Sequence, residues 1–175
     1  HYTRLLGEGS IPLRPGVERL LNEARQANIR LAIATTTTPA NVTALLENTL
    51  GKESIDWFEV IAAGDIVPAK KPAPDIYLYA MEKMQLTPEQ VVAFEDSENG
   101  VRSVVDAGIK RLLVTTNDYT RDHNFTGASL VLDELGEPGR PAKLFSGNPP
   151  SDGYVSLDDV FAMRCYGNIQ TANEY

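Results

Sequence analysis

Residues 91–100 read VVAFEDSENG, and within them a short apolar run ends directly in two carboxylates, Glu95 and Asp96. An apolar run of about four residues bounded by polar ones is typical of a strand that is buried on both faces. Ser97 follows as a good helix N-cap, and a helix is predicted to about residue 107. The segment therefore predicts a strand, a short acidic loop and a helix.

Units of the same kind lie on both sides of this segment. Further strands are predicted over residues 30–34, 59–63, 111–115 and 128–132, and further helices over residues 15–28, 38–46 and 75–84. Strands that read as continuous apolar runs and alternate with helices indicate a parallel sheet covered on both faces. The expected fold class is α/β, with a doubly wound parallel sheet.

The domain organisation follows from composition along the chain. At 175 residues and 42% hydrophobic side chains, one domain with a real core is expected. Residues 11–133 carry the alternating pattern, and residues 1–10 resemble the end of an amphipathic helix and a linker. Residues 134–175 are rich in glycine and proline, which predicts a loosely packed tail with one short helix at residues 157–163.

Composition also limits the partners. A formal net charge of -8 argues against a basic surface for nucleic acid or an anionic membrane, so a small-molecule partner is expected. The single cysteine, Cys165, excludes an internal disulfide framework and fits a reducing cytoplasm. No run approaches the roughly 18 to 20 apolar residues of a membrane span, and no signal-peptide pattern opens the chain. A soluble, cytoplasmic protein is expected.

Ligands of open parallel sheets bind outside the carboxyl ends of the strands, so the residues after each strand are the candidates for function. The first predicted strand ends at Thr35, and three more threonines and Pro39 follow. Hydroxyls and backbone N–H groups before a helix form an anion site suited to phosphate. For Thr37 and Thr38 a local role, with Thr38 as N-cap, is the preferred interpretation. Thr35 is the stronger functional candidate.

The second strand end leads to Lys70-Lys71-Pro72, with a further proline at Pro74. Prolines stiffen the backbone beside Lys71, and an ammonium held in place suits a phosphate oxygen or a carboxylate that must stay ionised. Lys70 is interpreted as solvated, and Asp75 as serving the amino end of the following helix.

The acidic pair at the third strand end is the most informative. Two adjacent carboxylates, Glu95 and Asp96, repel one another unless a cation compensates, and oxygen ligands favour a hard ion such as Mg²⁺. The alternative is a helix N-terminal pair stabilised by the helix dipole. Lys71 and Thr35 at neighbouring strand ends favour the metal site. His1 and His123 are isolated, and neither a Walker loop nor a dinucleotide fingerprint occurs.

These three segments together resemble the haloacid dehalogenase superfamily. Its later motifs are a threonine or serine at a strand end, a lysine often followed by proline, and an acidic pair at a later strand end. Here they correspond to Thr35, to Lys71 in KKPAPDIY and to Glu95-Asp96 in VVAFEDSENG. Residues 1–133 look most similar to the CbbY-type branch, which is related to β-phosphoglucomutase and phosphoglycolate phosphatase.

The resemblance implies a reaction through an aspartyl-phosphate, which splits one hard displacement into two easier ones. It implies that Asp96 holds Mg²⁺ and that Glu95 supports the ion through water. It further implies that Lys71 steadies the nucleophile and the phosphate, and that Thr35 with the N–H of Thr36 holds phosphoryl oxygens. A sugar phosphate or bisphosphate is the expected substrate.

The chain departs from the family because no D-x-D-G-T string, which would carry the nucleophile, occurs in it, and the helical cap that normally follows this motif is absent too. In the family that motif follows the central first strand, which would lie between the strands ending at Thr35 and Phe94, and a helical cap comes after it. The chain alone is therefore expected to be inactive and poorly folded. Its ending, CYGNIQTANEY, does not resemble the family, so a truncated or frame-shifted gene is considered.

Three interpretations of function follow. The first is the core part of a Mg²⁺-dependent phosphatase, monomeric when complete. The second is a non-catalytic module that binds phosphate or a partner, and the third is a sugar phosphomutase or dehalogenase of the same superfamily. The gene sequence upstream of His1 separates the first from the second, because an in-frame D-x-D-G-T after an apolar strand supports the enzyme.

Overall fold

The computed structural model describes residues 12–163. The expectations for residues 1–10 as a helix end and linker, for Cys165 and for the ending CYGNIQTANEY lie outside these described residues. Within them, no helix is both long and apolar enough to cross a membrane.

The observed elements follow the predicted ones closely. The helices are α2 (Val17–Gln26), α3 (Pro39–Thr49), α4 (Asp75–Met84), α5 (Glu98–Asp106) and α6 (Leu157–Ala162), with 3-10 turns η1 (Lys52–Trp57) and η2 (Pro88–Gln90). The strands are β1 (Leu31–Thr35), β2 (Phe58–Ala63), β3 (Val92–Glu95), β4 (Arg111–Thr115), β5 (Leu130–Leu132) and β6 (Leu144–Ser146). One boundary matters for the site, since Glu95 is the last residue of β3 rather than the first after it.

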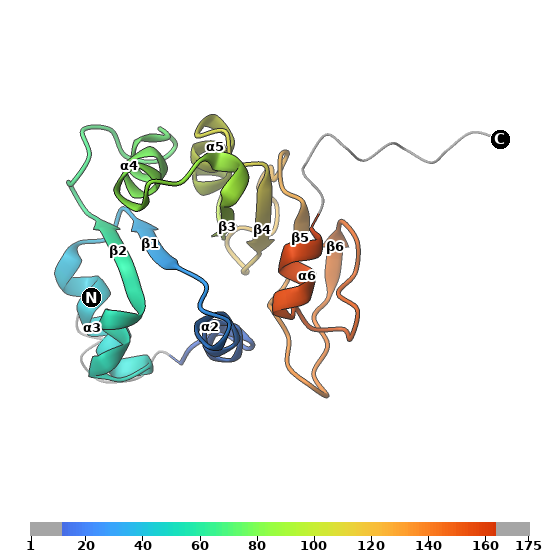
Figure 1. Ribbon diagram of the computed structural model, residues 1–175. Helices are drawn as coiled ribbons and strands as arrows, with labels where there is room; N and C mark the ends of the chain where they lie inside the picture. Colours follow the sequence, from blue (N-terminus) through green and yellow to red (C-terminus); the bar gives the residue numbers. More distant parts are fainter. Residues whose placement is uncertain (1–11, 164–175) are drawn as a thin grey trace.

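The strands form a parallel arrangement with one exception. β1 pairs with β2, and β3, β4 and β5 pair in that order, all in parallel. β6 adds an antiparallel edge strand beside β5, which the sequence analysis did not predict (Figure 1). Its three residues are all exposed, so they carry no alternation of buried and exposed positions from which a strand could be recognised.

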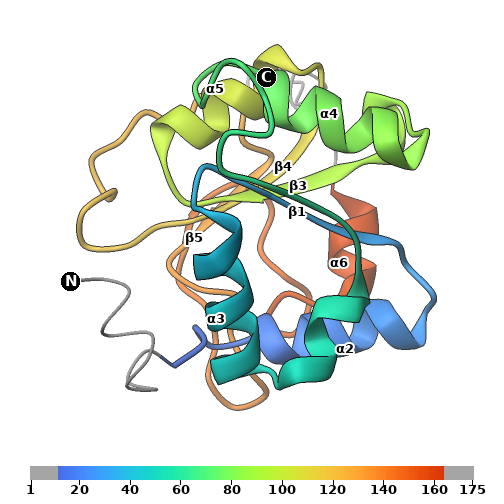
Figure 2. The same ribbon diagram turned by 90° about the vertical axis from the view of Figure 1, so that its left-hand side faces the viewer.

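Helices cover both faces of the sheet. In β4, Leu112 and Val114 point into the cluster under α4 and α5, while Leu113 between them joins the cluster under α2 and α6. This alternation is the period-two geometry of a strand, with both sides buried. Figure 2 shows α4 and α5 on one side of the strands and α2, α3 and α6 on the other. The prediction of a doubly wound α/β fold is confirmed.

The sheet is interrupted between β1 and β3. Among the described strands, β1 pairs only with β2, and β3 pairs on one edge only, with β4. A cavity of about 530 Å³ lies between them, and its lining is mainly apolar. It includes Ile33 of β1, Phe94 of β3, Leu20 of α2, Met81 of α4 and Phe161 of α6. The interruption lies at the place in the sheet where the sequence analysis expected it.

Several side chains of residues 134–163 pack against α2, whereas a loosely packed tail was expected over residues 134–175. Leu135, Val155 and Val160 are buried with Leu20 of α2 in one cluster. Arg19 of α2 reinforces this packing by donating hydrogen bonds to the carbonyls of Gly136 and Val155 at 3.0 and 2.9 Å. Glycines and prolines hide the apolar pattern, and the partner helix lies more than 100 residues away in the sequence. The predicted short helix is confirmed as α6.

Candidate functional site

Lys71 joins the carboxyl ends of two strands that do not pair with each other. Its Nζ donates to the carbonyl of Ala34 in β1 at 3.0 Å and to Oε1 of Glu95 in β3 at 2.5 Å. An ammonium carries three protons, and these two contacts use two of them. Lys71, which follows β2, therefore contacts both the end of β3 at Glu95 and the end of β1 at Ala34.

The loop that carries Lys71 is anchored to α5 just after this residue. The peptide bond from Lys71 to Pro72 is cis, and the carbonyl of Ala73 accepts a hydrogen bond from Ser103 Oγ in α5 at 2.7 Å. The Lys71 side chain is 14% exposed, whereas that of Lys70 is 55% exposed and pairs with the exposed Asp65. The exposure of Lys70 agrees with its interpretation as solvated, whereas Lys71 is turned inward.

The Glu95 side chain is largely buried, and one of its two carboxylate oxygens is engaged by two donors. Its side chain is 6% exposed, and Oε1 accepts hydrogen bonds from Lys71 and from the hydroxyl of Tyr77 in α4. The carboxylate lies against Gly100 in the first turn of α5, where an added Cβ would overlap it. Three elements thus surround this carboxylate, which explains how a charge is tolerated at a buried position.

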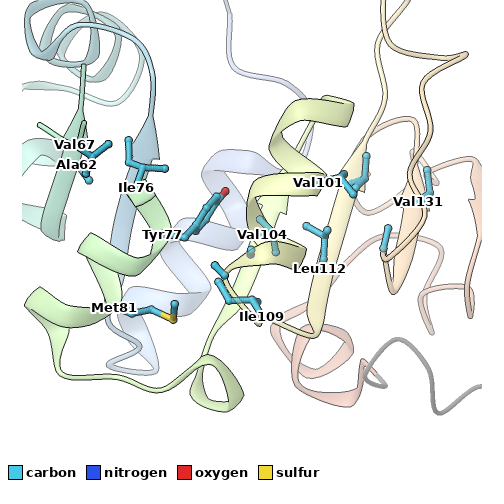
Figure 3. Close-up of a cluster of buried hydrophobic side chains, with 14 residues drawn as sticks. Ala62, Val67, Ile76, Tyr77, Met81, Val101, Val104, Ile109, Leu112 and Val131 are labelled. Atoms are coloured by element: carbon cyan, nitrogen blue, oxygen red, sulfur yellow. The ribbon is translucent and has the colours of Figure 1, made fainter. Parts of the chain in front are cut away.

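Tyr77 is the site residue that the sequence analysis missed. It is 8% exposed, and its ring lies in the apolar cluster between α4 and α5 (Figure 3). Burial, together with the nearby charge of Glu95, raises the pKa of its hydroxyl well above the usual value. The hydroxyl therefore stays protonated and remains a hydrogen-bond donor. A tyrosine rather than a phenylalanine on the buried face of a helix was the available signal.

Asp96 differs from Glu95 in exposure and in contacts. Its carboxylate is exposed, and it makes no hydrogen bond or ion pair within the part of the chain that the structure describes. The N-cap of α5 is Ser97, whose hydroxyl accepts from the N–H of Gly100 at 3.3 Å. The helix start is therefore capped without Asp96, which weakens the interpretation of the acidic pair as a simple helix terminus.

Glu95 and Asp96 are the candidate oxygen donors for Mg²⁺ among the described residues. Carboxylate oxygen is the ligand that this ion prefers, and Asp96 offers it at the surface of the site. In Glu95, Oε1 is engaged by two donors, so a contact through water suits it better than direct ligation. Residues 12–163 contain no group of three or more potential metal-binding side chains. The described residues fit a magnesium ion that keeps several waters and takes further oxygen ligands from elsewhere.

Among the four threonines after β1, some serve the local backbone and others have groups available to a ligand. Thr38 is the N-cap of α3 and accepts from the N–H of Asn41 at 3.4 Å, with Pro39 at the start of the helix, as predicted. Thr35 Oγ1 accepts from the N–H of Thr37 at 3.1 Å, which leaves its hydroxyl proton available to a ligand. Thr36 is exposed. The structure places Thr35 next to Ala34, whose carbonyl binds Lys71.

Comparison with known proteins agrees with this geometry. Residues 1–108 match the family model of haloacid dehalogenase-like hydrolases. The chain belongs to this family of hydrolases.

Within the family, the chain falls in the CbbY and phosphoglucomutase-like branch. It is 47% identical over 143 residues to protein CbbY of Cereibacter sphaeroides, covering 82% of this chain and 62% of that protein. The structure of CbbY from Rhodobacter sphaeroides in complex with xylulose-1,5-bisphosphate superposes with a TM-score of 0.73 at 47% identity, covering 78% of this chain and 60% of the other. The chain is also 39% identical to a phosphorylated carbohydrates phosphatase of Thermotoga maritima, over 56% of this chain and 44% of that protein. The chain thus spans about three fifths of the CbbY relatives it matches.

Proposed function

We propose that this chain is the core part of a Mg²⁺-dependent phosphatase that acts on a small sugar phosphate or bisphosphate. The observation that carries the proposal is the cluster of Lys71, Glu95 and Asp96 at the carboxyl edge of the sheet, with Thr35 beside it. It supplies a fixed cation, a hydroxyl donor and an exposed carboxylate, which are the groups that phosphoryl transfer requires. Xylulose-1,5-bisphosphate bound to the similar CbbY supports a sugar bisphosphate as substrate.

In this proposal each residue has one task. The third proton of the Lys71 ammonium donates to a phosphate oxygen, and the hydroxyl of Thr35 and the N–H of Thr36 donate to others. Asp96 would hold Mg²⁺ and Glu95 would support it through water, and the ion, when bound, would supply positive charge against the phosphate. The nucleophile is the first aspartate of the D-x-D-G-T motif, supplied from outside this chain. Its carboxylate oxygen bonds to phosphorus as the P–O bond to the sugar breaks, and the second aspartate of the motif protonates the departing sugar oxygen. Water then attacks the aspartyl-phosphate, which releases inorganic phosphate and restores the carboxylate.

The test measures phosphate release by the protein that also includes the sequence encoded upstream of His1. A panel of sugar monophosphates and bisphosphates would be assayed with Mg²⁺ and with excess chelator. Asp96→Asn is expected to lower activity at least about 100-fold and to weaken Mg²⁺ binding measured by calorimetry. Asp106→Asn, an exposed aspartate at the far end of α5, is the matched control. Full activity in the presence of chelator would refute the proposal.

A sugar phosphomutase is the second candidate. It is favoured by the likeness to β-phosphoglucomutase of Clostridium difficile, at 26% identity and a TM-score of 0.62 over 76% of this chain. The products separate the two activities, since a mutase returns an isomeric sugar phosphate and a phosphatase releases inorganic phosphate. Phosphate binding without turnover of any substrate would instead favour a non-catalytic module.

A further inference from the structure

Tyr77 contacts both members of the ion pair at the centre of the site. Its hydroxyl donates to Glu95 Oε1, and its ring lies 5.0 Å from the Nζ of Lys71, within range of a cation–π contact. One buried side chain of α4 therefore touches the anion through its polar end and the cation through its ring face.

The position of Glu95 depends on donors from two different elements. Lys71 approaches Oε1 from the loop before α4, and Tyr77 approaches the same oxygen from within α4. On another side the carboxylate is limited by Gly100 of α5. With both donors present the carboxylate has one arrangement, whereas with Lys71 alone it could follow the flexible lysine side chain.

The position of Lys71 depends in turn on Glu95. The ammonium is held between the Glu95 carboxylate and the carbonyl of Ala34, and these two acceptors set the direction of its remaining proton. The second donor, the Tyr77 hydroxyl, also stabilises part of the negative charge of Glu95, which would otherwise be balanced by Lys71 alone. The hydroxyl of Tyr77 thus influences both the direction in which the remaining Lys71 proton points and the strength of Lys71 as a hydrogen-bond donor.

We propose that Tyr77 is a positioning residue, which fixes Glu95 and thereby directs the third proton of Lys71 toward a bound phosphate group. This inference rests on the proposed function, because it assigns Lys71 to phosphate. The hydroxyl touches neither the substrate nor the reacting atoms, and it acts through Glu95.

The test compares Tyr77→Phe with Tyr79→Phe in the whole protein. Tyr79 lies on the same helix, contacts Lys83 through its ring and has no contact with Glu95, so it is a matched control for loss of one hydroxyl. We expect Tyr77→Phe to lower kcat/KM by about tenfold or more and to weaken binding of inorganic phosphate to a similar extent. Tyr79→Phe should change neither. The melting temperature of each variant shows whether the fold is retained.

A double-mutant cycle shows whether Tyr77 acts through Glu95. In a Glu95→Gln background, Tyr77→Phe should cause little further loss of phosphate binding, because the residue it positions has already been altered. Effects that simply add, or a Tyr77→Phe variant within twofold of wild type in both measurements, would overturn the inference.

The two proposals can fail separately. A wild-type protein that binds inorganic phosphate but hydrolyses no substrate refutes the phosphatase, and the binding data then still decide the role of Tyr77. A wild-type protein that neither binds nor hydrolyses phosphate overturns both.

Discussion

The Nζ of Lys71 lies 2.5 Å from Oε1 of Glu95, and this contact links the loop after β2 to the end of β3. Because β1 and β3 do not pair in the described sheet, this ion pair is one of the direct links between its two parts. Both side chains are largely buried, so the contact affects stability as well as chemistry.

Replacing Lys71 by methionine should destabilise the whole protein by about 3 kcal/mol, because it leaves the buried Glu95 without its cation. Lys70→Met removes only an exposed pair with Asp65 and should cost less than about 1 kcal/mol. Urea unfolding of both variants checks the difference. Equal losses would mean that the buried pair contributes no more than an exposed one.

Gly100→Ala should destabilise the protein, although alanine normally improves a helix by about 1 kcal/mol over glycine. The expected sign is reversed because an added Cβ would overlap the Glu95 carboxylate. Asn99→Ala, at the exposed neighbouring position of α5, serves as control and should be close to neutral. Thermal unfolding measures both variants, and a stabilised Gly100→Ala would show that Glu95 can move aside.

The start of α6 should be sensitive to one hydroxyl. Ser156 and Asp159 form a capping box, in which each side chain accepts a hydrogen bond from the backbone N–H of the other. Ser156→Ala should cost about 1 kcal/mol. Ser151→Ala removes one further hydrogen bond to Asp159 and should cost less. Denaturant unfolding gives both values, and no loss for Ser156→Ala would argue against the cap.

The same cap should depend on pH. Burial alone would raise the pKa of Asp159, but hydrogen bonds from Ser156 and Ser151 outweigh this and lower it. A carboxyl with a lowered pKa stabilises the fold above its unfolded pKa, and this stabilisation is lost as the pH falls through the folded value. Wild type should therefore lose more stability than Asp159→Asn on acidification below about pH 4. Parallel losses in the two proteins would contradict the assignment.

The isolated 175-residue chain should release no phosphate with Mg²⁺ and should bind a hydrophobic dye such as ANS. The first expectation follows from the absence of a D-x-D-G-T string, and the second from the apolar cavity between β1 and β3 and the 44% exposure of Phe94. Phosphate assays and dye fluorescence test them separately. Magnesium-dependent turnover by the isolated chain would refute the first.

Much of the site could be predicted from residues near one another in the sequence. Thr35, Lys71, Glu95 and Asp96 each follow or end a strand, and the carboxyl ends of parallel strands meet at one edge. Tyr77 could not be placed in the same way, because the face of α4 that meets Glu95 depends on how the helix packs on the sheet. The packing of Leu135 and Val155 against α2 was missed for the same reason, since their partners are distant in sequence.

The sequence by itself determined the α/β alternation, the helix starts and the residue types at the strand ends, because these depend on local periodicity, capping and turn chemistry. Only the tertiary structure decided which donors share Glu95, that Lys71 rather than Lys70 turns inward to bind it, and that Asp96 stays exposed. Those outcomes depend on contacts between elements that are far apart along the chain. A buried charged group is stable only when groups close to it in space pair with it, and local sequence does not show which groups these are.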